Sequence, residues 1–138
     1  MRTMNTEPIQ ALLKTTRTIA VVGISDREDR PSHFVSLYMQ QAGYRIIPVN
    51  PRYETVLGER CWPDLASIDE PVDMVNVFRP SADTPEIASQ AVAIGARSLW
   101  LQQGISHSEA ERIAQAAGLS VVMDRCLKVE HMAWVTKP

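Results

Sequence analysis

The stretch VVGISDREDRPSHFV, near the N-terminus, places side chains that can hold an anion directly after an apolar run. Gly23 allows a tight turn there, because glycine tolerates backbone angles that other residues avoid. Ser25, Arg30 and Ser32 supply hydrogen-bond donors, and Pro31 suits the start of a helix whose free N–H groups attract negative charge. The further glycines of a dinucleotide-binding turn are missing, so this loop would hold phosphate mainly with side chains. The alternative is a solvated loop whose charges pair with each other.

A second group of polar residues follows the apolar run YRIIPV, where Asn50, Pro51 and Arg52 stand. An NAD site usually has an acidic residue here, because its carboxylate binds the adenine ribose 2′-hydroxyl. This chain has no carboxylate at that place and has a cation beside it, which fits a ribose that carries a phosphate. Both NADP, with a 2′-phosphate, and coenzyme A, with a 3′-phosphate, meet that description. The alternative is that Asn-Pro only forms a turn.

Three more apolar runs end in residues that can contact a ligand: Phe78 and Arg79, then Gln102 and Gly104, then Cys126. The Phe-Arg pair can flank an adenine or a pantetheine arm, and the glutamine amide can hydrogen-bond beside a glycine that allows close approach. The Cys126 thiol, if it lies near helix N–H groups, could exchange with a coenzyme A disulfide. Each residue has a plainer alternative: a core phenylalanine, a helix-entry turn and a small buried cysteine. Their joint placement favours a ligand site.

The histidines offer no catalytic arrangement. His33, His107 and His131 lack the spacing of a Ser-His-Asp triad or of a metal site. No activated nucleophile or pair of carboxylates stands out either. We therefore assign no catalytic residue and no metal, and expect a binding protein rather than an enzyme.

Apolar runs that alternate with helix-like segments must position these loops. The runs predict five short strands at 17–24, 44–50, 72–78, 97–102 and 119–124. Helical spacing and caps predict helices at 6–16, 31–42, 81–94, 106–117 and 128–135, with Ser106 or Ser108 as the cap of the fourth. This alternation indicates an α/β fold: a three-layer, doubly wound, Rossmann-like parallel sheet with the expected strand order 3-2-1-4-5. Ligands bind such sheets at the carboxyl ends of the strands, where all the loops above begin.

Size and composition set the remaining bounds. The chain has 138 residues, which predicts one domain over 1–138, and its net charge of −2 gives no sign of a nucleic-acid partner. No apolar stretch reaches the ~20 residues of a membrane helix, and the N-terminus lacks the features of a signal peptide. We therefore expect a cytoplasmic protein that does not bind membranes and whose Cys61 and Cys126 are free thiols.

Five segments stand in an order that is more specific than any one of them: VVGIS with RPSHFV after four residues, YRIIPVNPRYETVLGERCWPDLASI, PVDMVNVFRP, GARSLWLQQGI and GLSVVMDRCLKVEH. In this order the chain resembles the bacterial and archaeal family of small, single-domain CoA-binding proteins. That family is related to the nucleotide-binding domain of the succinyl-CoA synthetase α subunit. The resemblance runs from about Ile19 to Val135.

The resemblance implies a Rossmann-type domain that binds coenzyme A. It places the phosphates at Gly23, Ser25, Arg30, Pro31 and Ser32, the adenosine at Asn50, Pro51 and Arg52, and cleft contacts at Phe78, Arg79, Gln102 and Gly104, with Asp124, Arg125 and Cys126 matching the family's DRC stretch. The expected function is a non-enzymatic or accessory module for coenzyme A or an acyl-CoA. The alternative is an NADP- or NAD-binding redox sensor or reductase-like protein. The acyl group and any protein partner stay open.

Overall fold

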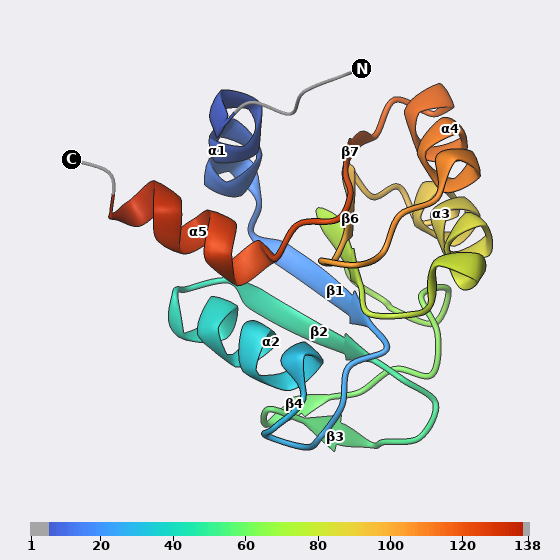
Figure 1. Ribbon diagram of the computed structural model, residues 1–138. Helices are drawn as coiled ribbons and strands as arrows, with labels where there is room; N and C mark the ends of the chain where they lie inside the picture. The colour runs from blue at the N-terminus through green and yellow to red at the C-terminus, as the bar shows by residue number, and fades with distance from the viewer. Residues whose placement is uncertain (1–5, 137–138) are drawn as a thin grey trace.

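The computed structural model describes residues 6–136 and is built around a five-stranded parallel sheet (Figure 1). Its strands are β1 (Thr18–Val22), β2 (Arg45–Val49), β5 (Met74–Val77), β6 (Ser98–Leu101) and β7 (Ser120–Val122). These strands are buried at nearly every position, because helices cover both faces of the sheet. The expected α/β class and all five expected strands are confirmed, each strand being shorter than its apolar run.

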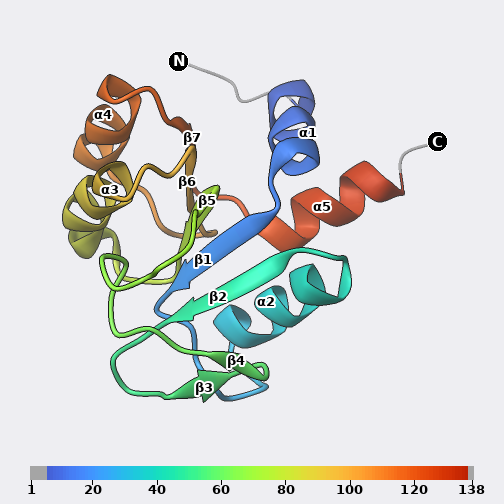
Figure 2. The same cartoon turned by 180° about the vertical axis from the view of Figure 1, so that it is seen from behind.

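Five α-helices form the outer layers (Figures 1 and 2). One face carries α1 (Thr6–Thr15), α2 (Pro31–Gln41) and α5 (Leu127–Val135), whereas the other carries α3 (Thr84–Ala93) and α4 (Ser108–Ala116). Alternate residues of β1 point to opposite cores: Ala20 packs with the α3 and α4 side, and Ile19 and Val21 pack with the other. The three-layer architecture is therefore as expected.

The order of the sheet is β2-β1-β5-β6-β7, so the 72–78 segment pairs with β1 and does not lie outside β2. The outer place beside β2 is held by Trp62, which forms a single parallel bridge to Val49. The Trp62 N–H donates to the Pro48 carbonyl, and the Asn50 N–H donates to the Trp62 carbonyl, both at 2.9 Å. The 3-2-1-4-5 pattern is thus kept with Trp62 as its third member. We expected the 72–78 strand to lie beside β2, and this is wrong. The chain after β2 contains no helix and places only Trp62 beside β2, and the 72–78 segment then pairs with the other side of β1.

Pro48 is tolerated in β2 because its backbone faces the outer edge of the sheet, where Trp62 lies. Its carbonyl accepts from Trp62, on the side of β2 that faces away from β1, and a strand residue directs its N–H and its carbonyl to the same side. The N–H that proline lacks is therefore absent from the outer edge and not from the β1–β2 ladder. A proline inside a strand predicts a local irregularity, and here it is limited to this edge.

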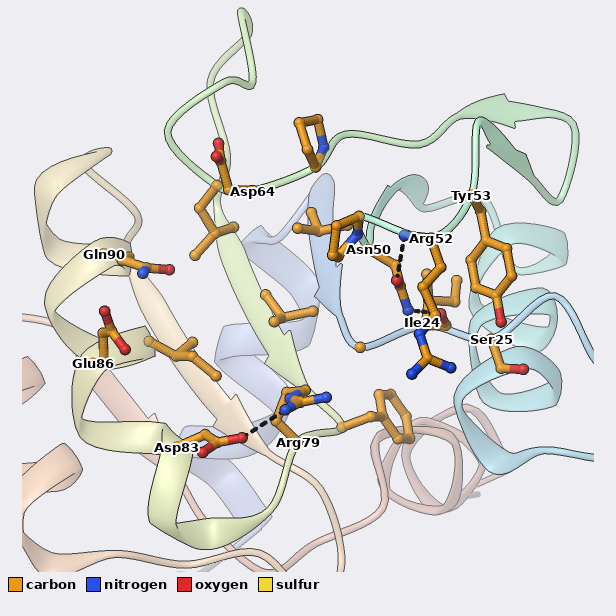
Figure 3. A pocket seen from close by; sticks show the side chains of 18 of the residues that line it. Ile24, Ser25, Asn50, Arg52, Tyr53, Asp64, Arg79, Asp83, Glu86 and Gln90 are labelled. Atoms are coloured by element: carbon orange, nitrogen blue, oxygen red, sulfur yellow. Dashed lines mark hydrogen bonds and ion pairs between the residues drawn. The ribbon is translucent and has the colours of Figure 1, made fainter.

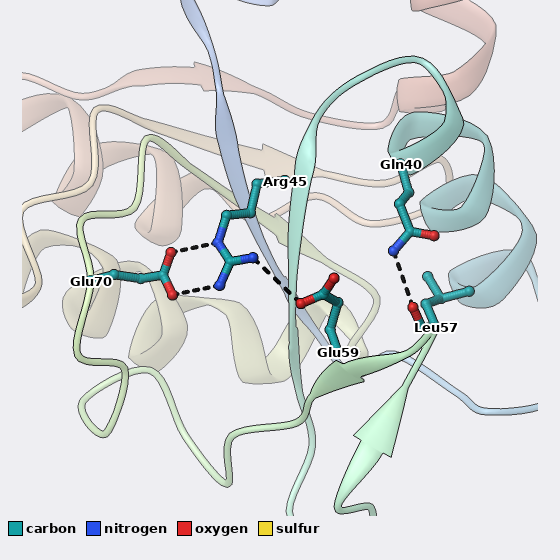
Figure 4. Close-up of polar contacts among 5 residues, drawn as sticks. All are labelled: Gln40, Arg45, Leu57, Glu59 and Glu70. Carbon is teal, nitrogen blue, oxygen red and sulfur yellow. Dashed lines mark hydrogen bonds and ion pairs between the residues drawn. The ribbon is translucent and has the colours of Figure 1, made fainter.

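A small hairpin follows β2, formed by β3 (Thr55–Val56) and β4 (Glu59–Arg60). Its turn residues Leu57 and Gly58 both have positive φ, at 56° and 75°. Figure 4 shows how the hairpin is tied to the body: the Gln40 amide donates to the Leu57 carbonyl at 3.1 Å, and Arg45 binds Glu59 and Glu70. The hydrogen bonds from Arg45 lower the pKa of the Glu70 carboxyl.

Two element starts differ from the expectation. The cap of α4 is His107, not Ser106 or Ser108, and its Nδ1 accepts from the Glu109 N–H at 3.1 Å. The helix expected at 81–94 begins with a 3-10 turn, η1 (Ser81–Asp83).

No helix of residues 6–136 has the length and apolar content to cross a membrane.

Candidate functional site

A cleft of about 660 Å³ opens at the carboxyl ends of β1, β2 and β5 (Figure 3). Eight of the residues singled out in the sequence line it: Gly23, Ser25, Arg30, Asn50, Pro51, Arg52, Phe78 and Arg79. They come from three loops that are far apart in the sequence and meet because parallel strands end on one edge. The structure therefore gathers the first three expected loops at one place.

Gly23, directly after β1, lies against the Phe78 carbonyl directly after β5 in the cleft wall. Its φ is +87°, and a Cβ atom there would lie 2.8 Å from the Phe78 carbonyl oxygen. Both the backbone angle and the lack of space exclude larger residues. The close approach lets the Phe78–Arg79 loop join the first loop in one continuous wall.

The first loop is held closed by its serines. The Ser32 Oγ accepts from the Ser25 N–H at 2.9 Å, and the Ser25 Oγ accepts from the Arg27 N–H at 3.1 Å. Ser32 is buried and shapes the loop from within, outside the lining of the cleft. Arg27 pairs with Asp29 at 3.2 Å, which is the internal pairing of charges that the plainer reading of this loop expected.

Arg30 is not part of that pairing. It is exposed, lines the cleft and has no hydrogen-bond or ion-pair partner for its guanidinium among residues 6–136. It is also the N-cap residue of α2, with Pro31 as the first helical residue and no side-chain hydrogen bond to the helix end. A cation and an uncapped helix N-terminus therefore share one place, and both favour an anion.

The second loop is organised by Asn50. Its Nδ2 donates to the Ile24 carbonyl and its Oδ1 accepts from the Arg52 N–H, both at 2.9 Å (Figure 3). The amide is thus occupied in joining the first and second loops. Within the part of the chain that the structure describes, the exposed Arg52 guanidinium has no partner. Figure 3 shows Arg52 and Arg79 entering the cleft from different loops.

The charges of the cleft are divided between two sides. Arg30 and Arg52 belong to the first two loops, whereas Asp83 and Glu86 belong to the η1–α3 segment. Arg79 lies between them and forms an ion pair with Asp83 at 2.8 Å. Figure 3 shows Glu86 and Gln90 on the helix side of the cleft. A ligand that carries both phosphate and amino groups suits this division.

The remaining expected residues, Pro31, Gln102, Gly104 and Cys126, also lie outside the lining of this cleft. Gln102 and Cys126, together with Pro31 and Phe78, line a second cavity of about 370 Å³. Gly104 lines neither cavity. Phe78 lines both, so the cavities adjoin at that side chain.

Gln102 and Gly104 have partners in the Asp124–Leu127 segment. The Gln102 Oε1 accepts from the Leu127 N–H at 2.9 Å, and the Gly104 N–H donates to the Asp124 Oδ1 at 2.7 Å. Asp124 has a φ of +59°, which few residues other than glycine adopt. These bonds fix the β6 loop against the start of α5, where Cys126 is the N-cap residue.

The other cysteine and the histidines stand apart from the cleft. Cys61 is a buried free thiol whose Sγ donates to the Asn50 carbonyl at 3.4 Å, and burial raises its pKa. His33 is buried, and His107 caps α4. The Nδ1 of His131 and the Tyr38 hydroxyl share a hydrogen bond of 2.8 Å, and burial lowers the pKa of His131.

Sequence reasoning missed several residues that line the cleft, among them Tyr53, beside Arg52, and Asp64, Glu86 and Gln90 on the far wall (Figure 3). Glu86 and Gln90 were detectable, because α3 begins at the carboxyl edge of the sheet and its first turns must border any site there. Asp64 follows the Trp62 bridge, and no sequence signal predicted that return of the chain.

Comparison with known proteins gives consistent matches. A family model described as a CoA binding domain matches residues 17–132. The YneT protein of Bacillus subtilis is 46% identical over 123 residues, which are 89% of this chain and 91% of YneT. The ADP-forming acetate–CoA ligase II of Archaeoglobus fulgidus is 26% identical over 72% of this chain, but the match spans only 15% of the ligase.

Solved structures agree with these matches. A Thermus thermophilus protein is 40% identical with a TM-score of 0.90, covering 95% of this chain and 99% of its own. A hypothetical protein of Pyrococcus horikoshii is 35% identical with a TM-score of 0.92, covering 96% of this chain and 93% of its own. The likeness therefore extends over the whole sheet and its helices.

Proposed function

The chain belongs to the CoA-binding domain family, and from this we propose that it binds coenzyme A or an acyl-CoA in the cleft at the carboxyl ends of β1, β2 and β5. We further propose that it does so as a non-enzymatic or accessory module. The observation that carries the proposal is the pair of unpartnered guanidiniums, Arg30 and Arg52, beside the uncapped N-terminus of α2.

Coenzyme A has three phosphate groups, and this part of the cleft suits them. The N-terminus of α2 carries the positive end of the helix dipole, and Arg30 adds a full charge at the same place. Arg52 stands after β2, where a phosphorylated ribose is expected to lie. We assign the diphosphate to Arg30 and the helix end, and the 3′-phosphate to Arg52.

The far side of the cleft suits an adenine. Leu65 and Ile87 provide apolar surface, and the Asp64 and Glu86 carboxylates stand where they can accept a hydrogen bond from an amino group. The division of charge in the cleft then matches the division of charge in the ligand. This assignment supports a nucleotide and not a simple anion such as inorganic phosphate.

The binding role is supported by how the polar groups are used. Arginine stays protonated in proteins and cannot serve as a general base, and the Asn50 amide is occupied in joining two loops. These groups recognise charge and do not transfer protons. The matched ligase is a far longer protein, so its activity is not assigned to this chain.

Isothermal titration of the ligand-free protein with coenzyme A, dephospho-CoA, NADP and NAD tests the proposal. Arg52→Ala should weaken coenzyme A by about 1.5–3 kcal/mol and leave dephospho-CoA nearly unchanged, because it removes a charged hydrogen bond to the 3′-phosphate. Arg30→Ala should weaken the binding of coenzyme A and of dephospho-CoA to a similar extent. Arg97→Ala, an exposed arginine before β6 at the opposite edge of the sheet, is the matched control.

The outcomes separate the candidate ligands. Binding of coenzyme A but not of the dinucleotides would support the proposal. Binding of NADP alone would favour the redox alternative, with Arg52 at the 2′-phosphate. Equal affinity of Arg52→Ala and the parent for coenzyme A would refute the assignment of the 3′-phosphate.

A further inference from the structure

We propose that the second cavity, which adjoins the cleft at Phe78, binds the acyl group of an acyl-CoA and selects for an uncharged, apolar acyl chain. The inference rests on the proposed binding of coenzyme A in the cleft. It goes further in naming the thioester, and not free coenzyme A, as the preferred ligand. Gln102 is the residue that we assign to the thioester carbonyl.

The walls of the cavity are mostly apolar. They are formed by Pro31, Phe34, Val35, Phe78 and Ile105, with Gln102, Gln103 and Cys126 completing the lining. No lining residue carries a permanent charge. The ammonium of Lys128 lies 5.7 Å from the centre of the Phe34 ring, but Lys128 is not part of the lining.

The cavity adjoins the cleft that holds the proposed phosphate site. Phe78 lines both spaces, and Pro31 of the cavity follows Arg30 of the cleft in the chain. A coenzyme A whose diphosphate lies at Arg30 can therefore extend its pantetheine arm past Phe78. The end of that arm, which carries the thiol or the thioester, then enters the apolar space.

Gln102 supplies the polar feature that distinguishes a thioester from a thiol. Its side chain is almost completely buried, with 4% of its surface exposed, and its Oε1 is engaged by the Leu127 N–H. That donor fixes the orientation of the amide and leaves Nε2 as the free end. Among the described residues, Nε2 has no hydrogen-bond partner. It is not one of the fully enclosed unpaired atoms, which belong to His33, Asn76 and Ser98.

An amide that lines the cavity and has no protein partner for its N–H groups favours a ligand with an acceptor. The thioester carbonyl of an acyl-CoA is such an acceptor, and free coenzyme A lacks it. The apolar walls should bind the acyl chain beyond the carbonyl. Each methylene that enters should tighten binding about fourfold until the chain reaches the mouth of the cavity.

Isothermal titration with coenzyme A, acetyl-CoA, butyryl-CoA and succinyl-CoA tests the inference. We expect butyryl-CoA to bind more tightly than acetyl-CoA, and acetyl-CoA more tightly than coenzyme A. Succinyl-CoA should bind about tenfold more weakly than butyryl-CoA or worse, because its terminal carboxylate would lose water without gaining a cation.

Two variants locate the effect. Gln102→Glu keeps an oxygen for the Leu127 N–H but removes the free N–H groups. The affinity for butyryl-CoA should therefore fall about fivefold or more, while the affinity for coenzyme A changes little. Phe34→Ala opens the cavity at a side chain that is 41% exposed, and should reduce the dependence on acyl length without unfolding the protein. Gln115→Glu, at an exposed position of α4, is the matched control for the added charge.

Labelling of Cys126 with N-ethylmaleimide, followed by intact-mass spectrometry, provides a second measurement. Saturating butyryl-CoA should slow the labelling more than saturating coenzyme A, and Cys126→Ala should lose the modification. Equal binding of all four ligands, or tight binding of succinyl-CoA, would overturn the inference while leaving coenzyme A binding intact. Failure of every ligand to bind would instead overturn the proposed function, and the inference with it.

Discussion

Replacement of Gly23 by alanine should destabilise the fold and damage the cleft together. A residue with a Cβ atom at a φ of +87° costs about 1–2 kcal/mol because of contact with its own backbone. The new Cβ would also lie 2.8 Å from the Phe78 carbonyl oxygen, and the chain must move to relieve that overlap. Such overpacking costs about 1–3 kcal/mol. We therefore expect Gly23→Ala to lower the free energy of unfolding by about 2–5 kcal/mol.

Gly95→Ala is the matched control, because Gly95 has a φ of +78° and its Cβ would meet nothing within 4 Å. It should show the cost of the backbone angle alone, about 1–2 kcal/mol. Urea unfolding of both variants and the parent, monitored by circular dichroism, gives the difference. If Gly23→Ala is no less stable than Gly95→Ala, the close approach of β1 and β5 does not constrain this position.

Other predictions concern side chains outside the cleft. His131 has a pKa below its ordinary value of 6.5, so the unfolded chain takes up a proton first as the pH falls. The contribution of His131 is therefore fully present above pH 6.5 and lost below it, and urea unfolding at pH 7 and about pH 5 should show a smaller loss in His131→Phe than in the parent. An equal loss in both would mean that other groups cause it. Cys126, which lines the second cavity, should form a mixed disulfide when its thiolate attacks coenzyme A disulfide and releases one coenzyme A thiolate. Intact-mass spectrometry should detect the adduct in the parent and not in Cys126→Ala, and its persistence in that variant would point to Cys61.

Much of the fold was predictable from local patterns. The strands are short apolar runs buried on both sides, and glycine or proline lies beside several element ends, so their number and kind follow from the sequence. The member of the sheet beside β2 was not predictable. Trp62 contributes a single bridge, and one residue gives no periodic signal. The 72–78 run was therefore assigned to a place that it does not hold.

The cleft was predictable in outline, because polar residues at the ends of parallel strands must share one edge. The use of individual side chains was not. Ser32, Asn50 and Gly104 were expected to contact a ligand, and the structure engages all three in hydrogen bonds within or between loops. Such bonds join residues up to 26 positions apart, and a sequence shows the donors and acceptors without showing which of them meet.

The Trp62 bridge has a consequence for how this sheet meets other molecules. An exposed strand edge offers a row of free N–H and carbonyl groups to which a strand of another chain can add. On the outer edge of β2, Trp62 already bonds to the Pro48 carbonyl and the Asn50 N–H, and Pro48 has no N–H to offer. The opposite edge strand, β7, has only three residues. Neither edge of this sheet thus provides a long template for pairing, which protects the chain against edge-to-edge aggregation.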